Sequence, residues 1–240
     1  MNTDSLEFEY VGNDLEAMSF ATNYHRWIFE HFTPYLGQNV AEIGAGTGNF
    51  SQLLLTSPIH HLTTFEPSND MFPLLHQKLR NIPRAATVND YFGSVSHRYI
   101  RQFDSVVYVN VLEHIEHERL ELDFVRKTLK SNGHICIFAP ALPFLYSEFD
   151  ASIGHKRRYQ KDQLVNLVES AGYKIVRVKY FDIAGILPWY FNFVLLRKTL
   201  TPANVNLYDK LVVPVMRVIE KLMVVPAGKN LLLIGQNVKQ

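Results

Sequence analysis

The strongest constraint on the fold is a short apolar run that ends in three alternating glycines. Residues 39–50 read NVAEIGAGTGNF, with Glu42 near the end of the run and then Gly44, Gly46 and Gly48. The run predicts a buried strand, and the glycines predict a turn into a helix. Glycine has no Cβ to keep a ligand away from the backbone, and it allows the tight turn. We therefore expect a ligand at the carboxyl end of the first strand, where open α/β sheets bind their ligands.

Two nucleoside cofactors use a loop of this kind. The dinucleotide fingerprint G-x-G-x-x-G would need a third glycine at position 49, where this chain has Asn49. The next predicted strand, residues 61–66, ends in Glu66. Its carboxylate could accept hydrogen bonds from both hydroxyls of a ribose, which fits NAD and S-adenosylmethionine alike.

Three segments in order carry a family resemblance. The sequences EIGAGTG at 42–48, FEPS at 65–68 and FDSVVYVNVLEHI at 103–115 resemble the successive motifs of class I S-adenosylmethionine-dependent methyltransferases. The resemblance covers roughly residues 35 to 180. It is nearest to the methyltransferase type 11 and type 12 group, which includes the ubiquinone-biosynthesis enzymes. It implies S-adenosylmethionine as cofactor.

The order of predicted elements indicates an α/β fold. Strands that alternate with helices predict a parallel sheet with helices on both faces. The resemblance adds a Rossmann-like, seven-stranded sheet of order 3-2-1-4-5-7-6 with the last strand antiparallel. We expect strands at 39–43, 61–66, 86–88, 104–109, 134–138, 173–180 and 231–238. We expect helices at 17–36, from 49, from 69, at 116–129, at 162–171 and at 207–223, the last kinked by Pro214.

The 240 residues are expected to form a single methyltransferase domain, 1–240, with three additions. These are an N-terminal helical cap at 1–36, an active-site loop at 139–160 and an apolar, amphipathic segment at 182–226 before the last strand. Cys136, the single cysteine, lies in a predicted buried strand and excludes an intrachain disulfide, so we expect a reducing cytoplasm.

Charge is divided unevenly along the chain. Residues 1–150 have 10 Lys and Arg against 18 Asp and Glu, a balance of −8, whereas residues 151–240 have 14 against 5, a balance of +9. The imbalance is compatible with ordinary surface variation or with a C-terminal third that faces a phosphate, a carboxylated substrate or a membrane surface. The positive charge lacks regularly interleaved aromatic residues, so we expect no nucleic-acid partner.

The resemblance places cofactor contacts at the ends of the first four strands. Gly44 and its neighbours would approach the methionyl and ribose portions, Glu66 would bind the ribose, and an acid after the third strand would meet the adenine amine. Each assignment has a structural alternative. The glycines could only allow a helix to pack tightly on the strand, and Asp90 could be an ordinary loop residue. The expected cofactor residues are Glu42, Gly44, Ala45, Gly46, Gly48, Glu66, Pro67, Asp90, Tyr91 and Asn110.

Methyl transfer needs alignment, and a base only if the acceptor keeps its proton near neutral pH. The candidates are His114, which follows Glu113 after the fourth strand, and His155. A packing or capping role is the alternative for His114. Some ubiquinone-type relatives bind a metal through the Glu-His pair and an earlier glutamate. That earlier position is Asn110 here, so we expect no metal.

The connection at 139–160 is longer than such loops usually are, which favours a functional role over a solvated surface loop. We expect His155 to act as general base or substrate ligand, and Arg157 or Arg158 to bind an anionic group. Tyr146, Asp150, Arg157, Arg158 and Tyr159 are the expected substrate-binding residues. The loop resembles one in bacterial methyltransferases that accompany surface-polysaccharide and lipid biosynthesis.

The apolar segment at 183–196 is too short and too interrupted to span a bilayer. It predicts core or lid packing, or else peripheral contact with a membrane or a lipid-like acceptor, because Arg197, Lys198 and an amphipathic helix follow it. Either way it would cover the active site.

We therefore expect methyl transfer from S-adenosylmethionine to a small-molecule or lipid- or glycan-linked acceptor, more at oxygen than at nitrogen or carbon. The fourth strand is not followed by an Asn/Asp-Pro-Pro-aromatic motif, which disfavours amino-group methylation of adenine or glutamine. Two rivals stay open: a catalytically silent module that binds the cofactor, and a nicotinamide-dependent oxidoreductase, which Asn49 disfavours. The sequence does not indicate an oligomeric state.

Overall fold

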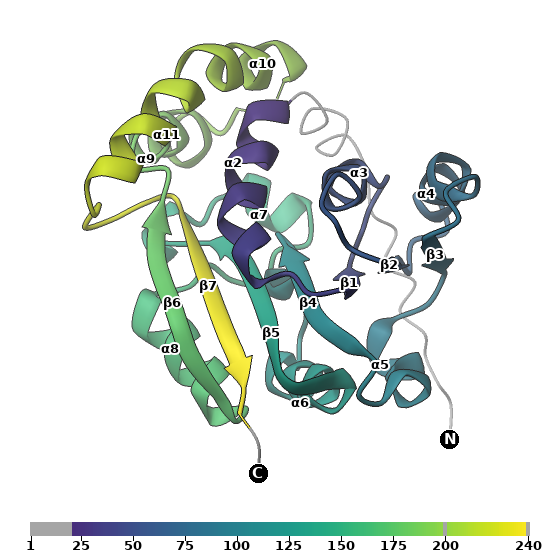
Figure 1. The fold of residues 1–240 in the computed structure, drawn as a ribbon. Coiled ribbons are helices and arrows are strands. Elements are labelled where there is room, and N and C mark those ends of the chain that lie inside the picture. Colours follow the sequence, from purple (N-terminus) through teal and green to yellow (C-terminus); the bar gives the residue numbers. More distant parts are fainter. Residues whose placement is uncertain (1–20, 199–200, 239–240) are drawn as a thin grey trace, which may run out of the picture.

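The computed structural model describes residues 21–198 and 201–238. Its centre is a seven-stranded sheet of order β3-β2-β1-β4-β5-β7-β6 (Figure 1). The strands are β1 Asn39–Ile43, β2 His61–Phe65, β3 Ala85–Val88, β4 Phe103–Val109, β5 Leu129–Pro140, β6 Tyr173–Phe181 and β7 Asn230–Asn237.

The strand directions confirm the expected sheet. Strands β1 to β5 pair in parallel, so their carboxyl ends meet at one edge. Strand β7 lies between β5 and β6 and is antiparallel to both. Apolar side chains dominate the central strands because these are covered on both faces.

Helices cover both faces of the sheet. The α-helices are α2 Thr22–Phe32, α3 Asn49–Leu54, α4 Phe72–Leu79, α5 Phe92–Val95, α6 Glu118–Thr128, α7 Glu148–Ser152, α8 Lys161–Ser170, α9 Ile186–Trp189, α10 Pro202–Leu211 and α11 Val213–Leu222. A π-helix, η5 Tyr190–Leu195, continues α9. The 3₁₀ turns are η1 Thr33–Tyr35, η2 Ser96–Tyr99, η3 Leu112–His114 and η4 Pro143–Leu145.

The two faces have separate hydrophobic cores. Buried side chains of α5, α6 and α8 form one core with the sheet, and those of α2, α3, α4 and α11 form the other. Trp27 of α2 is 2% exposed, and its ring centroid lies 3.9 Å from that of Phe181 at the end of β6. Burial of one such side chain contributes about 1.5 to 3 kcal/mol, so α2 is fixed across the sheet beside the ligand-binding edge.

Several element boundaries differ from the expected ones. The first helix ends at Phe32, and residues 17–20 of its expected range lie outside the described residues. The helix expected from 69 begins at Phe72, because the Ser68 hydroxyl accepts hydrogen bonds from the N–H groups of Asp70 and Met71 and forms a turn. The charged helix begins at Glu118 rather than 116, and β5 is longer than expected at both ends.

The helix expected at 207–223 is two helices that meet at Val212. Pro214 lies in the first turn of α11, where its missing N–H costs no hydrogen bond. The predicted kink is therefore a break between α10 and α11.

The three expected additions have the following structures. Of the cap at 1–36, the structure describes α2 and η1, and residues 1–20 lie outside the description. The loop at 139–160 contains η4 and α7, and the segment at 182–226 contains α9, η5, α10 and α11, with residues 199–200 not described. Among the described residues, no helix has the length and apolar character needed to cross a bilayer.

Candidate active site

A cavity of about 1750 Å³ lies at the carboxyl edge of the parallel strands. It extends from the glycine turn after β1 to the walls made by α2, α9, η5 and α10. Pockets for one small ligand usually measure about 300 to 1000 Å³, so this cavity has room for a cofactor and an acceptor together. The expected residues that line it are Glu42, Gly44, Ala45, Gly46, Glu66, Pro67, Asp90, Tyr91, Asn110, His114, His155 and Arg158.

The glycine turn has the backbone that its sequence predicts. Gly44, Gly46 and Gly48 have φ of 65°, 55° and 81°, which L side chains rarely adopt. A Cβ on Gly44 would stand 2.6 Å from the Val111 side chain. Gly48 does not line the cavity, and a Cβ there would stand 2.9 Å from Leu75, so its place in the structure fits the packing alternative.

Two buried carboxyl groups hold this turn. Glu66 accepts hydrogen bonds from the N–H groups of Gly46 at 2.7 Å and Ser68 at 2.9 Å. A carboxylate has about four acceptor positions, so Glu66 can also accept from the hydroxyls of a ribose in the cavity. Glu42 lies behind the turn and accepts from the Ser51 hydroxyl of α3, and its burial raises its pKa to about 8.

The turn that follows β4 lines the cavity. Asn110 has φ of 53°, and its N–H donates to the Phe138 carbonyl of β5 at 2.8 Å. Residues other than glycine rarely adopt a positive φ, and those that do concentrate at functional sites. The turn brings η3, with Glu113 and His114, toward the loop that contains His155.

Asp150 fixes the orientation of His155. The Nδ1 atom of His155 lies 2.9 Å from Asp150 Oδ1, and Arg158 donates to the same oxygen from Nε at 3.0 Å and Nη2 at 2.7 Å. Ser147 caps α7 and also binds Asp150. Burial opposes ionisation, yet hydrogen bonds from His155, Arg158 and Ser147 lower the pKa of Asp150. A carboxylate on Nδ1 leaves Nε2 of a neutral imidazole as the proton acceptor.

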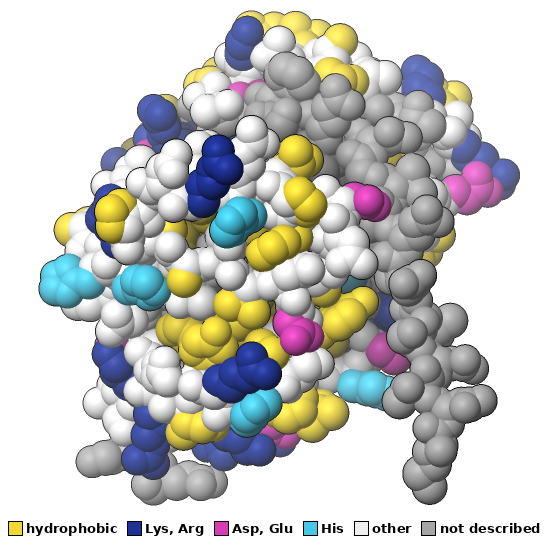
Figure 2. Space-filling view, turned by 90° about the vertical axis from the view of Figure 1, so that its right-hand side faces the viewer, with side chains coloured by type: hydrophobic (Ala, Val, Ile, Leu, Met, Phe, Trp, Pro, Cys, Tyr) yellow, Lys and Arg dark blue, Asp and Glu magenta, His cyan; other side chains and the backbone are white. Residues whose placement is uncertain are grey.

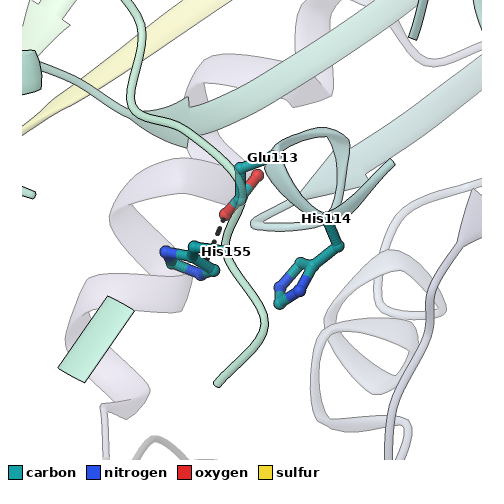
Figure 3. Close-up of side chains that lie close together, drawn as sticks. All are labelled: Glu113, His114 and His155. Carbon is teal, nitrogen blue, oxygen red and sulfur yellow. Dashed lines mark ion pairs between the residues drawn. The ribbon is translucent and has the colours of Figure 1, made fainter. Parts of the chain in front are cut away.

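Glu113 lies beside His155, near its Nε2 atom (Figure 3). Its Oε1 is 3.6 Å from Nε2 of His155, and both carboxyl oxygens are buried without a hydrogen-bond partner. Burial raises the pKa of Glu113 to about 7, while the neighbouring His155 opposes the rise. The His114 and His155 rings meet edge to face with centroids 4.7 Å apart. Burial and then His155 lower the pKa of His114 to about 3, so His114 is neutral at physiological pH.

These three residues could also hold a cation. One ligand atom from each of Glu113, His114 and His155 lies within 4.8 Å of the others. A carboxylate with two imidazoles is a ligand set that binds transition-metal cations. The expectation of no metal rested on Asn110, which replaces the earlier glutamate. The sequence did not indicate that His155 would lie beside the Glu-His pair. The absence of a metal stays a prediction.

Most of the expected substrate-binding residues hold the loop itself. The Tyr146 hydroxyl donates to the His155 carbonyl at 2.7 Å, and Arg157 pairs with Glu118 and donates to the Ile115 carbonyl at 3.0 Å. Tyr159 is buried, and its backbone pairs with that of Pro140 and Leu142. These three residues and Asp150 are not among the cavity lining, and Arg158 is. These four residues bind other groups of the protein, which is why they do not line the cavity. Their positions in the sequence did not indicate those partners.

A second polar cluster in the cavity wall was missed in the sequence. Asp182, after β6, is buried and accepts from the hydroxyls of Tyr24 at 3.1 Å and Tyr208 at 2.5 Å. Lys229 Nζ lies 3.2 Å from Asp182 and between 5.2 and 5.8 Å from the ring centroids of Tyr24, Trp189 and Tyr208. All of these except Asp182 line the cavity. No short motif could have found this cluster, because its members are spread over about 200 residues.

The comparisons with known proteins identify one family and one fold. Residues 19–178 match the model of a family described as a methyltransferase domain. A SAM-dependent methyltransferase from Archaeoglobus fulgidus superposes with a TM-score of 0.63 at 17% identity, over 93% of this chain and 98% of that one. A SAM-dependent methyltransferase from Thermotoga maritima superposes with a TM-score of 0.63 at 14% identity, over 95% and 96%. The [4+2]-cyclase SpnF superposes with a TM-score of 0.62 at 12% identity, over 91% and 82%. A search of curated proteins found no match.

Proposed function

Because the chain belongs to the methyltransferase-domain family, we propose that this S-adenosylmethionine-dependent enzyme methylates an oxygen of its acceptor, with His155 as general base. The acceptor is a small molecule or a lipid- or glycan-linked compound. The observation that carries the proposal is the Asp150–His155 pair at the wall of the cavity, 2.9 Å between Oδ1 and Nδ1.

The residues around the glycine turn fit the cofactor. Gly44 and Gly46 present bare backbone to the cavity, and Glu66 has acceptor positions left for ribose hydroxyls. Asp90, Tyr91 and Asn110 also line the cavity, and we expect the first two beside the adenine and Asn110 at the floor under the cofactor. The bound cofactor supplies a methyl carbon on a sulfonium, already activated for displacement.

The base follows from the nature of the acceptor. A hydroxyl keeps its proton near neutral pH, so its attack on the methyl carbon is faster if a positioned base takes that proton. In the proposed step the hydroxyl proton passes to Nε2 of His155, the oxygen–carbon bond forms, and the carbon–sulfur bond breaks with its electron pair on sulfur. Asp150 on Nδ1 and Glu113 at 3.6 Å from Nε2 stabilise the resulting imidazolium.

An anionic group of the acceptor would find its cation in Lys229 rather than in the paired arginines. The guanidinium groups of Arg157 and Arg158 are already bound to carboxylates of the protein. Lys229 lines the cavity, and its ammonium group lies near the Tyr24, Trp189 and Tyr208 rings. Its partner Asp182 is shared with two tyrosine hydroxyls, which leaves part of the lysine charge for an incoming anion.

A catalytically silent cofactor-binding module is the second candidate. One observation keeps it open: the fold superposes on SpnF, which is named as a [4+2]-cyclase and not as a methyltransferase. The fold alone therefore does not require methyl transfer from every chain that adopts it.

The test compares the wild type with His155→Ala. Purified protein is incubated with methyl-labelled S-adenosylmethionine and an extract of lipids and glycans from the source cells, and labelled product is measured. We expect His155→Ala to lower product formation by about 10²- to 10⁴-fold, with cofactor affinity in calorimetric titration within about twofold of wild type.

The exposed histidine His60 supplies the matched control, and His60→Ala should keep full activity. Wild type that binds the cofactor but releases no product with any extract would favour the silent module. Equal turnover by His155→Ala and His60→Ala would overturn the role of His155. Failure to bind S-adenosylmethionine, with binding of NAD(H) instead, would overturn the proposal as a whole.

A further inference from the structure

The outer side of α10 and α11 exposes a continuous row of aliphatic side chains. We call Leu207, Leu211, Val215, Val218 and Leu222 the outer stripe. Their exposed fractions are 61%, 63%, 56%, 58% and 82%. The spacings of four, four, three and four residues place them on one side of the two helices, in spite of the break at Val212. Met223 and Val224, exposed by 56% and 91%, continue the row beyond α11.

The acidic residues of this segment face inward. Asp209 is buried and accepts from the N–H groups of Asn23 at 3.0 Å and Tyr24 at 2.8 Å, at the start of α2. Glu220 is buried and accepts from the Ile183 N–H at 2.9 Å. Residues 201–228 contain no other acid, so their carboxylates contribute little to the outer surface.

Two of the three basic residues between 201 and 228 face outward, and the third, Arg217, pairs with Glu30 of α2. Lys210 and Lys221 are exposed, and each lies next in sequence to a leucine of the outer stripe, Leu211 and Leu222. In Figure 2, hydrophobic and basic side chains lie together along the upper edge of the molecule, where Figure 1 places α10. The surface is therefore both aliphatic and positively charged.

We propose that the outer stripe docks on the surface of an anionic lipid bilayer. Aliphatic side chains beside lysines on the exposed side of a helix pair are the pattern of helices that lie in the membrane interface. Each lysine near an anionic surface strengthens such binding. A second copy of the chain fits less well, because an isologous contact through the stripe would bring lysines of like charge together.

Docking would place the bilayer on the far side of a helix that walls the active site. Val205 and Tyr208 of α10 line the cavity, while Leu207 and Leu211 of the same helix face outward. Lys198 lines the cavity and is exposed, so the cavity reaches the surface near the start of α10. This inference deepens the proposed function and rests on it for the nature of the acceptor. The acceptor would be lipid-linked and would enter from the membrane.

The test is sedimentation of the full chain, without cofactor, with two kinds of vesicles. One kind is phosphatidylcholine alone, and the other contains phosphatidylglycerol as well. We expect the wild type to sediment with the anionic vesicles and not with the neutral ones. Leu211→Glu with Leu222→Glu, and separately Lys210→Glu with Lys221→Glu, should lower the bound fraction by roughly tenfold or more.

Each double variant has a matched control. Leu74→Glu with Ile100→Glu changes two apolar residues that are each 51% exposed, and Arg80→Glu with Arg98→Glu makes the same charge change as the lysine variant at exposed sites outside the segment. Both controls should bind as the wild type does. Calorimetric titration with S-adenosylmethionine should give wild-type affinity for every variant and so show that each one folds.

Three outcomes would overturn the docking proposal. They are wild type that stays in the supernatant with anionic vesicles, variants and controls that bind equally, and a wild-type dimer in solution that Leu211→Glu with Leu222→Glu dissociates. The last would assign the stripe to a second copy. Because vesicle binding is measured without cofactor and methyl transfer without vesicles, the failure of one proposal is distinguishable from the failure of the other.

Discussion

At the scale of single residues, the glycine turn is the position with the least freedom to change. Gly44 combines a φ of 65° with a Cβ position 2.6 Å from Val111. We expect Gly44→Ala to lower the free energy of unfolding by about 2 to 4 kcal/mol, from backbone strain and overlap together. Chemical denaturation measures it.

The double variant Gly44→Ala with Val111→Ala separates the two causes. It removes the overlap, allowing for the small cost of Val111→Ala measured alone, but keeps the positive φ. Partial recovery of stability is expected. Full recovery would show that the backbone conformation costs nothing, and no recovery would show that the overlap is not the cause.

The residues around His155 allow a test of metal dependence. Asp150 fixes His155 through Nδ1, and the proposed base needs no cation to take a proton. We expect dialysis against a chelator to leave labelled-product formation unchanged, and elemental analysis of the purified protein to find no stoichiometric metal. If activity were lost and zinc or iron restored it, Glu113, His114 and His155 would be metal ligands instead.

At the scale of elements, the Asp182 cluster joins parts of the chain that share no motif. It links α2 through Tyr24, α10 through Tyr208 and the start of β7 through Lys229. These contacts hold α10 against α2 and form part of the cavity wall. The 182–226 segment is thus part of the active-site wall and is not an appendage to the sheet.

Removal of that buried carboxylate should be costly. We expect Asp182→Ala to lower the free energy of unfolding by about 3 to 5 kcal/mol, because Lys229 and two tyrosine hydroxyls lose their partner. Asp123→Ala, which breaks an exposed pair with Arg119 on α6, is the comparison and should cost no more than about 1 kcal/mol. Similar costs for both variants in urea denaturation would contradict a structural role for the cluster.

At the scale of the whole molecule, buried titratable groups predict a stability maximum near pH 6. Burial raises the pKa of Glu42 from 4.5 to about 8 and that of Glu113 from 4.5 to about 7. The folded protein therefore retains protons that the unfolded chain releases, and these two groups lower stability as pH rises from about 5 to about 8. Burial also lowers the pKa of His25 and His31 from 6.5 to about 4 and that of His114 to about 3. The folded protein takes up these three protons later than the unfolded chain, so the three histidines outweigh the two carboxyl groups below about pH 6, and stability falls as pH drops further.

Glu42→Gln isolates one part of this profile. The variant keeps a hydrogen-bond acceptor for Ser51 but has no charge to bury, so its loss of stability between pH 6 and pH 9 should be smaller than that of the wild type by at least about 1 kcal/mol. Urea denaturation at both pH values measures this difference. Glu169→Gln, at an exposed position of α8, should follow the wild type. If both variants followed the wild type, Glu42 would not be the titrating group.

The sequence alone determined the alternation of strands with helices and the glycine turn, because these follow from local patterns, whereas the strand order was implied by the family resemblance. An apolar strand, a glycine turn and Glu66 lie within one strand-turn-helix-strand unit, and strands that alternate with helices allow few arrangements. The acceptor end depended on tertiary structure. Asp150, His155 and Glu113 meet only because the loop after β5 folds back on η3, and Lys229 meets Asp182 only because β7 lies between β5 and β6. Which charges face outward on α10 and α11, and which ones hold α2, was likewise decided by packing, since Asp209 and Lys210 are neighbours in the sequence, yet Asp209 is buried and Lys210 is exposed.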